Sequence, residues 1–169
     1  MRSVTVDDIT IREASSGDAD AIAPLFDAYR QFYGKPPDLE LARAFLGQRL
    51  GNAESIVLIA LSAGGAEPLG FVQLYPTFSS LQCNRAWVLN DLFVAERARR
   101  RGVAERLMQA AASSAQHAGV SSLSLSTAHD NVAAQRLYTK LGYVLDEDFR
   151  TYALTIGRLP IHRSTATSP

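Results

Sequence analysis

Cysteine, net charge and long apolar runs are all scarce in this sequence, and each scarcity excludes a class of protein. The single cysteine, Cys83, excludes an intramolecular disulfide and a cysteine-rich zinc site. Lys plus Arg number 17, as do Asp plus Glu, so no overall charge favours nucleic acid or an anionic membrane. The longest apolar run, residues 56–61, is far shorter than the roughly 20 residues that span a bilayer. Since the N-terminus lacks an apolar signal segment, we expect a cytoplasmic protein without a membrane or nucleic-acid partner.

The sequence does contain enough apolar material for one folded domain. Of its 169 residues, 47% are hydrophobic and 20% are charged. These fractions are typical of globular proteins, and the length suits a single domain. The end of the chain, residues 158–169, has no apolar face. We therefore expect one domain over residues 1–157, followed by a flexible tail over residues 158–169.

Hydrophobic periodicity predicts strands and helices that alternate along the chain. Period-two alternation and short apolar runs predict strands, whereas apolar positions three and four apart predict helices. The expected strands are residues 9–14, 55–62, 69–75, 86–94, 122–126, 143–144 and 149–156, with a loop at 76–84. The expected helices run from Asp18 to the stop at 34–37, from Asp38 to about Gly51, and over 101–118 and 131–141. This order predicts an α/β fold, with a mixed sheet and helices on both faces.

The basic residues, although balanced overall, gather at one place. Five of the 17 lie within residues 97–106, between a predicted strand and the predicted helix 101–118. Gly102 and Ala104 are small enough for a ligand to approach the backbone, and the first N–H groups of a helix lack partners within it. Because helix N-termini and arginines both favour phosphate, this segment predicts an anion site. The alternative is a solvated basic helix start.

Two motifs in this half of the chain resemble those of a known family. Neither a dinucleotide fingerprint nor a P-loop occurs. Residues 89–104, a strand followed by R-x-x-G-x-A at a helix start, resemble the acetyl-CoA-binding motif of the GNAT superfamily of N-acetyltransferases. Residues 131–143 resemble the superfamily's other motif, N-x-x-A-x-x-L-Y-x-x-x-G-[FY]. With the order of strands, the resemblance covers about residues 9–156.

The resemblance implies a GNAT-type fold with acetyl-CoA as cosubstrate and no metal. The sheet would have six to seven strands, mixed but mostly antiparallel, with helices on both faces. Strands 89–94 and 122–126 would lie parallel and splay apart, so that pantetheine binds exposed backbone in the gap. An amide N–H near Leu92 would stabilise the oxyanion that forms at the thioester. The implied cofactor-binding residues are Leu92, Phe93, Val94, Arg99, Arg100, Arg101, Gly102, Val103, Ala104 and Asn131.

The implied reaction is the transfer of an acetyl group to a primary amine of a small molecule, by direct attack in a ternary complex. An amine with a pKa of about 10 must lose a proton, and the departing thiolate benefits from an acid. Tyr138 is the expected acid, and Asp91 the expected base, through water or as the group that holds the ammonium. The alternatives are a core aromatic for Tyr138 and a carboxylate paired with an arginine for Asp91.

The acceptor is the least determined part of this expectation. Candidate substrate-binding residues are Tyr29, Tyr33, Trp87 and Asn90, although aromatics at helical spacing usually belong to a core. The chain resembles in particular the branch of diamine, amino-acid and histone-type acetyltransferases. Two other functions stay open: a protein or peptide lysine or N-terminal acetyltransferase, and a non-catalytic acyl-CoA-binding module. Dimerisation is common in the superfamily, which makes a homodimer an expectation as well.

Overall fold

One five-stranded sheet organises the computed structural model, which describes residues 9–65 and 67–157. Its strands lie in chain order, and β1 to β4 pair antiparallel, whereas β5 pairs parallel with β4. This confirms the predicted mixed and mostly antiparallel sheet. The strands are β1 (Thr10–Glu13), β2 (Ile56–Leu61), β3 (Pro68–Ser79), β4 (Asn84–Val94) and β5 (Ser122–Leu125).

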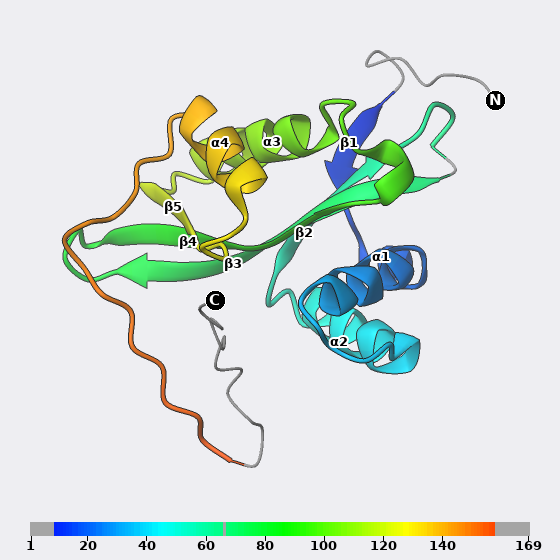
Figure 1. The fold of residues 1–169 in the computed structure, drawn as a ribbon, viewed down its shortest axis with the longest axis horizontal. Helices are drawn as coiled ribbons and strands as arrows, with labels where there is room; N and C mark the ends of the chain where they lie inside the picture. The colour runs from blue at the N-terminus through cyan, green and yellow to red at the C-terminus, as the bar shows by residue number, and fades with distance from the viewer. Residues whose placement is uncertain (1–8, 66, 158–169) are drawn as a thin grey trace, which may run out of the picture.

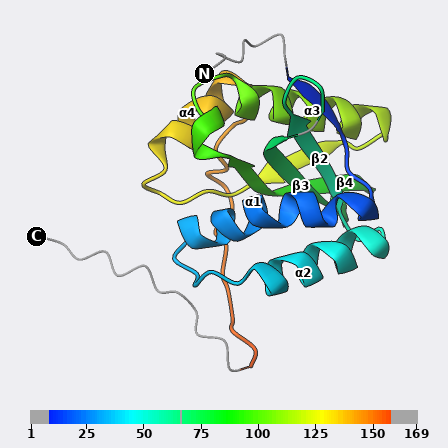
Figure 2. The same ribbon diagram turned by 90° about the vertical axis from the view of Figure 1, so that its right-hand side faces the viewer.

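Helices cover both faces of the sheet, as the sequence predicted (Figure 1). Two lie side by side against one face, and two lie on the other face (Figure 2). The first pair is α1 (Ala19–Phe32) and α2 (Leu39–Gly51), and the second pair is α3 (Val103–His117) and α4 (Val132–Lys140). Two short 3₁₀ turns, η2 (Ser16–Asp18) and η3 (Glu96–Ala98), precede α1 and α3. The core lies on both sides of the sheet; its fully buried side chains include Ile22, Leu46, Phe71, Leu107 and Met108.

The helix boundaries follow from residues with identifiable capping roles. The Asp38 carboxylate accepts a hydrogen bond of 3.0 Å from the backbone N–H of Leu41 and caps α2. Helix α3 starts after Gly102 and ends before Gly119, and both glycines have a positive φ. A left-handed residue ends the regular backbone with little strain only if it is glycine. The sequence therefore predicted these helices to within a few residues.

Strand β4 contains a bulge at Asn90, which no sequence pattern indicated. Gln73 of β3 pairs with Asp91, whereas the next residue, Leu74, pairs with Leu89, so Asn90 has no partner on β3. One extra residue in a strand breaks the alternation of side chains between the two faces. The bulge therefore decides which residues of β4 face α1 and which face α3.

The expected loop at residues 76–84 is wrong. Strands β3 and β4 continue to pair as far as Ser79 opposite Asn84, which leaves only residues 80–83 as the turn. Proline lacks an N–H donor and is tolerated where a strand has a neighbour on one side only. Strand β2 pairs with β3 only as far as Leu74, so Pro76 lies in a part of β3 that needs no donor on that side.

The expected strands at residues 143–144 and 149–156 are also wrong, and the sheet has five strands instead of six to seven. After Tyr143 the chain runs away from the sheet (Figure 1). Alternating apolar residues favour an extended backbone, but a strand also requires a neighbouring strand to pair with, and here the segment lies beside none.

The tail over residues 158–169 lies outside the described residues. Among the helices of the described chain, none is long and apolar enough to cross a membrane. The cytoplasmic location stays a prediction.

Candidate functional site

Strands β4 and β5 separate at the position where the resemblance implies a gap. Their parallel pairing runs from Ala86 opposite Ser122 to Leu89 opposite Leu125 and stops there. The bulge at Asn90 follows directly, and bulges bend a strand away from its neighbour. Within the described chain, the β4 backbone at Leu92 to Val94 therefore pairs with β3 on one side only.

The same bulge turns Asp91 and Phe93 toward α1. The Phe93 ring lies 6.3 Å from the Tyr29 ring of α1, measured between centroids. Trp87, on the other side of the bulge, lines a hollow with Ser113 and His117 of α3. Unbroken alternation would have put Trp87, Asp91 and Phe93 on one face. The structure therefore separates Trp87 from the other candidates on β4.

Asp91 is a buried carboxylate held by amide donors. Gln73 Nε2 donates to its Oδ2 at 2.7 Å, and Asn90 Nδ2 donates to its Oδ1 at 3.1 Å. Gln73 is itself fully buried, and its Oε1 accepts a hydrogen bond of 3.2 Å from Ser55 Oγ. Among the described residues, no Lys, Arg or His forms an ion pair with Asp91. The site therefore holds a buried carboxylate without a cation among the residues that the structure describes.

Tyr29 lies next to this carboxylate, and Tyr33 and Tyr138 lie next to Tyr29. Burial, and then the charge of Asp91, raise the pKa of the Tyr29 hydroxyl. Burial also raises the pKa of the Tyr138 hydroxyl, although its hydrogen bond with Thr127 lowers it, and Tyr33 adds a smaller raising contribution. The Tyr29 and Tyr33 rings stack edge to face, with 5.1 Å between centroids. The structure thus brings together four of the predicted residues, from α1, β4 and α4.

Tyr75 belongs to the same polar network beneath the site. Its hydroxyl accepts a hydrogen bond of 2.8 Å from Gln73 Nε2, the nitrogen that also contacts Asp91. Burial, followed by the charge of Asp91, raises the pKa of Tyr75 to about 12. The hydroxyl consequently stays neutral over the physiological range.

The turn before α3 has a backbone conformation suited to an anion. Arg100 has φ 60° and Gly102 has φ 74°, with Arg101 between them outside the positive range. Residues that alternate between left- and right-handed conformations point successive N–H groups into one concavity, which binds anions. No side chain caps α3, and a Cβ built on Gly102 would have no heavy atom within 4 Å. The turn is therefore open to a ligand.

The arginines of this segment have different surroundings. Arg97 forms an ion pair of 2.7 Å with Glu67 and so ties η3 to the β2–β3 loop. The Arg99 guanidinium lies over the Phe93 ring, 5.8 Å from its centroid, and Nε donates to the Val94 carbonyl at 3.3 Å. Arg100 is exposed and Arg101 half-buried. In the predicted basic cluster, Arg97 and Arg99 therefore contact neighbouring parts of the chain, whereas Arg100 faces solvent.

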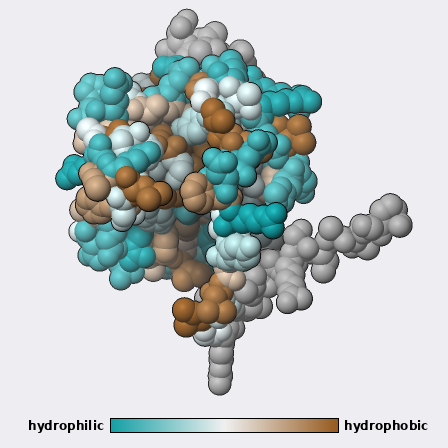
Figure 3. Space-filling model, turned by 90° about the vertical axis from the view of Figure 1, so that its left-hand side faces the viewer, coloured by the Kyte–Doolittle hydropathy of each residue, from teal (hydrophilic) through white to brown (hydrophobic). Residues whose placement is uncertain are grey.

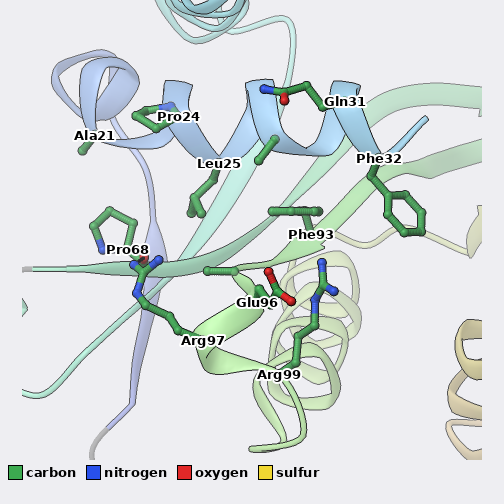
Figure 4. Close-up of a pocket in the computed structure, with 12 residues that line it drawn as sticks. Ala21, Pro24, Leu25, Gln31, Phe32, Pro68, Phe93, Glu96, Arg97 and Arg99 are labelled. Atoms are coloured by element: carbon green, nitrogen blue, oxygen red, sulfur yellow. Dashed lines mark hydrogen bonds between the residues drawn. The ribbon is translucent and has the colours of Figure 1, made fainter. Parts of the chain in front are cut away.

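A groove of about 530 Å³ lies between α1 and the end of β4 (Figure 4). Its size falls in the range of small-molecule sites. Phe32 and Arg99 lie at one end, and Pro68 and Arg97 at the other (Figure 4). Because Phe93 lines the groove and also contacts Tyr29, the groove adjoins the tyrosine beside Asp91.

The remaining predicted residues occupy supporting positions. Asn131 is the N-cap of α4, where its Oδ1 accepts a hydrogen bond of 3.3 Å from the Ala134 N–H. The Val103 side chain is buried, and Ala104 is half-buried in the first turn of α3. Only backbone groups of Val103 are therefore free to meet a ligand, whereas Asn131 orients the helix that carries Tyr138.

Sequence reasoning did not single out Gln73. It stands alone as a polar residue within the apolar run of residues 69–75. A lone amide in a buried strand must find hydrogen-bond partners, which is a signal for a buried polar network. That signal could have identified the residue that holds Asp91.

The site fits acetyl-CoA on two independent features of this chain. The turn at Arg100 to Gly102 offers N–H groups and open space to the pyrophosphate. The β4 backbone beyond the bulge offers unpaired peptide groups to the amides of pantetheine. Among the described residues, no group of three or more His, Cys, Asp or Glu is arranged to hold a metal ion.

Comparison with known proteins agrees with these features. Residues 22–143 match the family described as Acetyltransferase (GNAT) family. The chain is 48% identical over 148 residues to the uncharacterized N-acetyltransferase YhfO of Bacillus subtilis, covering 88% of this chain and 98% of that protein. It is 27% identical to the D-amino-acid N-acetyltransferase of Saccharomyces cerevisiae, covering 83% of this chain and 88% of that protein.

A solved structure of a probable acetyltransferase has the same fold. It superposes with a TM-score of 0.84 at 42% sequence identity, covering 89% of this chain and 99% of the solved chain. The chain belongs to the GNAT family of acetyltransferases and is an enzyme of that family.

Proposed function

We propose that the enzyme transfers an acetyl group from acetyl-CoA to the primary amine of a small molecule, by direct attack in a ternary complex. The observation that carries this proposal is the buried Asp91 carboxylate, which has no cation among the described residues. A buried charge is stable only with a partner, and an ammonium group on the acceptor supplies one.

Asp91 binds the acceptor ammonium and receives its proton, directly or through one water. A carboxylate offers about four lone-pair sites, so the bonds from Gln73, Asn90 and the Tyr29 hydroxyl leave capacity for one further donor. Because these two amides fix its orientation, the carboxylate meets the amine without reorganisation. Gln73 is therefore a positioning residue, which acts on the reaction through Asp91.

Tyr138 is the general acid. Burial raises its pKa above the ordinary value of 10, so the hydroxyl keeps its proton at neutral pH. It lies near Tyr33. In the overall reaction the amine nitrogen bonds to the thioester carbonyl carbon and the C–S bond breaks. The thiolate takes the proton of Tyr138, and the second proton that the nitrogen loses returns to Tyr138 through water.

The turn before α3 and the exposed backbone of β4 hold acetyl-CoA. The helix dipole of α3 and the N–H groups from Arg100 to Ala104 attract the pyrophosphate. An N–H near Leu92 stabilises the oxyanion at the thioester carbonyl. Acetyl-CoA supplies the activated acyl group, and no residue of the chain needs to act as a nucleophile.

Two observations favour a small acceptor over a protein. The groove beside the tyrosines has the volume of a small-molecule site. A relative of similar length acts, by its name, on D-amino acids, whose amine is a small-molecule amine. A free amino acid or related small amine is thus the acceptor class that we propose.

The deciding experiment measures thiol release from acetyl-CoA with a panel of amino acids of both chiralities, diamines, aminoglycosides and lysine peptides. We expect turnover with a small amine, and a loss of roughly 100-fold or more in kcat/KM for Asp91→Asn. The matched control is Asp130→Asn, an exposed aspartate before α4, which keeps full activity. Turnover only with peptides would favour a protein acetyltransferase, and tight binding of acetyl-CoA without turnover would favour a binding module.

A further inference from the structure

A threonine just beyond β5 continues the inward-facing side of that strand. Leu123 and Leu125 are half-buried, whereas Ser124 and Ser126 between and after them are exposed. Thr127 is half-buried again, as the alternation of side chains in a strand requires. The pairing of β5 with β4 has ended at Leu125, so Thr127 follows directly on the place where the two strands separate.

The Thr127 hydroxyl is buried and faces Tyr138. Its oxygen is inaccessible to solvent, and among the described residues it has no hydrogen-bond partner apart from the Tyr138 hydroxyl. Residues 144–157 do not reach it, because they run away from the sheet (Figure 1). The hydrophobic side chains on the segment that projects below the domain stand in solvent (Figure 3). Since buried hydroxyls are normally hydrogen-bonded, Thr127 depends on Tyr138.

The loop that carries Thr127 is fastened to the helix that carries Tyr138. Gln135 Nε2, on α4, donates hydrogen bonds of 3.2 Å to the Ala128 carbonyl and 3.0 Å to the His129 carbonyl. Gln135 lies three residues before Tyr138, about one helical turn away. These bonds hold the loop and the helix together, and so fix the two hydroxyls relative to each other.

The surroundings of the pair decide which hydroxyl donates. If the phenol donated its proton to Thr127, the threonine proton would be buried without an acceptor among the described residues. If Thr127 donates to the phenol oxygen, its own proton is satisfied and the phenol proton stays available for another group. The effect on the pKa of Tyr138 agrees with this direction, because a donor to the phenolate favours the ionised form.

We propose that Thr127 is a positioning residue that acts on the reaction through Tyr138. Its hydroxyl donates to the phenol oxygen, directs the phenol proton toward the departing sulfur, and stabilises the phenolate after transfer. In that transfer the O–H bond of Tyr138 breaks and an S–H bond forms, while Thr127 keeps its own proton. This inference rests on the proposed function, since it requires Tyr138 to be the acid.

The first test removes the threonine hydroxyl without changing the shape of the side chain. We expect Thr127→Val to lower kcat roughly tenfold, the value of one hydrogen bond to a charged group, with both KM values unchanged. Thr127→Ser, which retains the hydroxyl, should restore most of the activity. The matched control is Thr139→Val, at an exposed residue beside Tyr138 whose Oγ1 donates to the Gln135 carbonyl at 3.1 Å. The control should keep the activity of the wild type.

The same substitution in the Tyr138→Phe background separates positioning from packing. If Thr127 acts through the phenol, Thr127→Val should cause no further loss there. A tenfold loss that persists in this background would mean that the threonine only supports the fold, and would overturn the proposal. Equal kcat for Thr127→Val and the wild type would overturn it as well.

The second test requires no turnover. A fluorinated tyrosine at position 138 ionises at a lower pH than tyrosine, and its fluorine resonance reports the titration of this one residue. We expect Thr127→Val to raise the titration midpoint by about one pH unit, because the phenolate loses its donor. An unchanged midpoint would refute the hydrogen bond. If the midpoint shifts but Tyr138→Phe keeps full activity, the pair exists and the acid role in the proposed function is wrong.

Discussion

The amide nitrogen of Gln73 donates a hydrogen bond of 2.7 Å to Oδ2 of Asp91, and both side chains are buried. Ser55 Oγ donates to the other end of the same amide, which fixes its orientation. The carboxylate of the proposed base is thus held by a chain of hydrogen bonds that begins on the loop before β2 and crosses β3.

Replacing Gln73 by methionine should weaken both folding and acceptor binding. Methionine fills a similar volume but leaves Asp91, Ser55 and Tyr75 without their amide partner. We expect the free energy of unfolding to fall by about 1–3 kcal/mol, measured by denaturant titration. Because Asp91 is then poorly oriented, KM for the amine should rise while KM for acetyl-CoA stays constant. Gln109→Met, on the exposed side of α3, is the control; equal changes in both KM values would argue against positioning.

Replacing Tyr138 by phenylalanine should lower kcat by roughly 100-fold, because the hydroxyl is the proposed acid. Tyr143→Phe is a matched control just beyond the end of α4, with its ring 6.1 Å from that of Tyr138. Within the described structure the Tyr143 hydroxyl is buried without a hydrogen-bond partner, so its removal should leave activity and stability nearly unchanged. Since burial raises the pKa of Tyr138, the wild type should keep its acid function up to pH values above 10. Full activity of Tyr138→Phe would exclude the acid role.

Alanine variants of the two glycines at the ends of α3 distinguish the effect of backbone strain from the effect of ligand binding. Gly102 and Gly119 have φ of 74° and 69°, and a Cβ on either would have no heavy atom within 4 Å. Alanine at either position should therefore destabilise the fold similarly, by about 1–2 kcal/mol. Only Gly102→Ala should also weaken acetyl-CoA binding in calorimetry, and Gly102→Glu should abolish it. Equal acetyl-CoA affinity in the two alanine variants would place the pyrophosphate elsewhere.

Asp27 should make folding depend on pH. The backbone N–H of Asp38, followed by Gln31 and Arg30, lowers its pKa below the ordinary 3.8. A carboxylate with a lowered pKa stabilises the fold above its unfolded pKa, and this stability is lost as the pH falls through the folded value. Unfolding titrations below pH 4 should show a decline that Asp27→Asn reduces. An unchanged slope in the variant would contradict this assignment.

Local signals in the sequence were sufficient to predict most of the helices and strands. Helix α2 was predictable because Asp38 is a capping residue and Gly51 lies at its end, and α3 because a long alanine-rich run is bounded by glycines. The turn before α3 and the position of Tyr138 on α4 were predictable from two motifs of fixed spacing. Their roles in binding and catalysis stay predictions.

Long-range relationships were not predictable in the same way. The apolar run over residues 86–94 contains no sign that Asn90 is bulged, because the bulge arises from the register with β3. Trp87 was consequently grouped with the acceptor residues, although it faces α3. Residues 149–156 show a strand pattern, but the pattern does not include the neighbouring strand with which a strand must pair.

The bulge at Asn90 reverses the alternation of side chains in β4, so the residues before it and the residues after it follow opposite patterns. A substitution in the strand keeps this pattern. Deletion of Asn90 would make Leu89 and Asp91 neighbours on opposite faces, so Asp91 and Phe93 would still face α1, but the strand would lose its bend and the gap beside β5 would close. The pairing of Gln73 with Asp91 thus sets the face of the carboxylate, whereas the one extra residue sets the separation of β4 from β5.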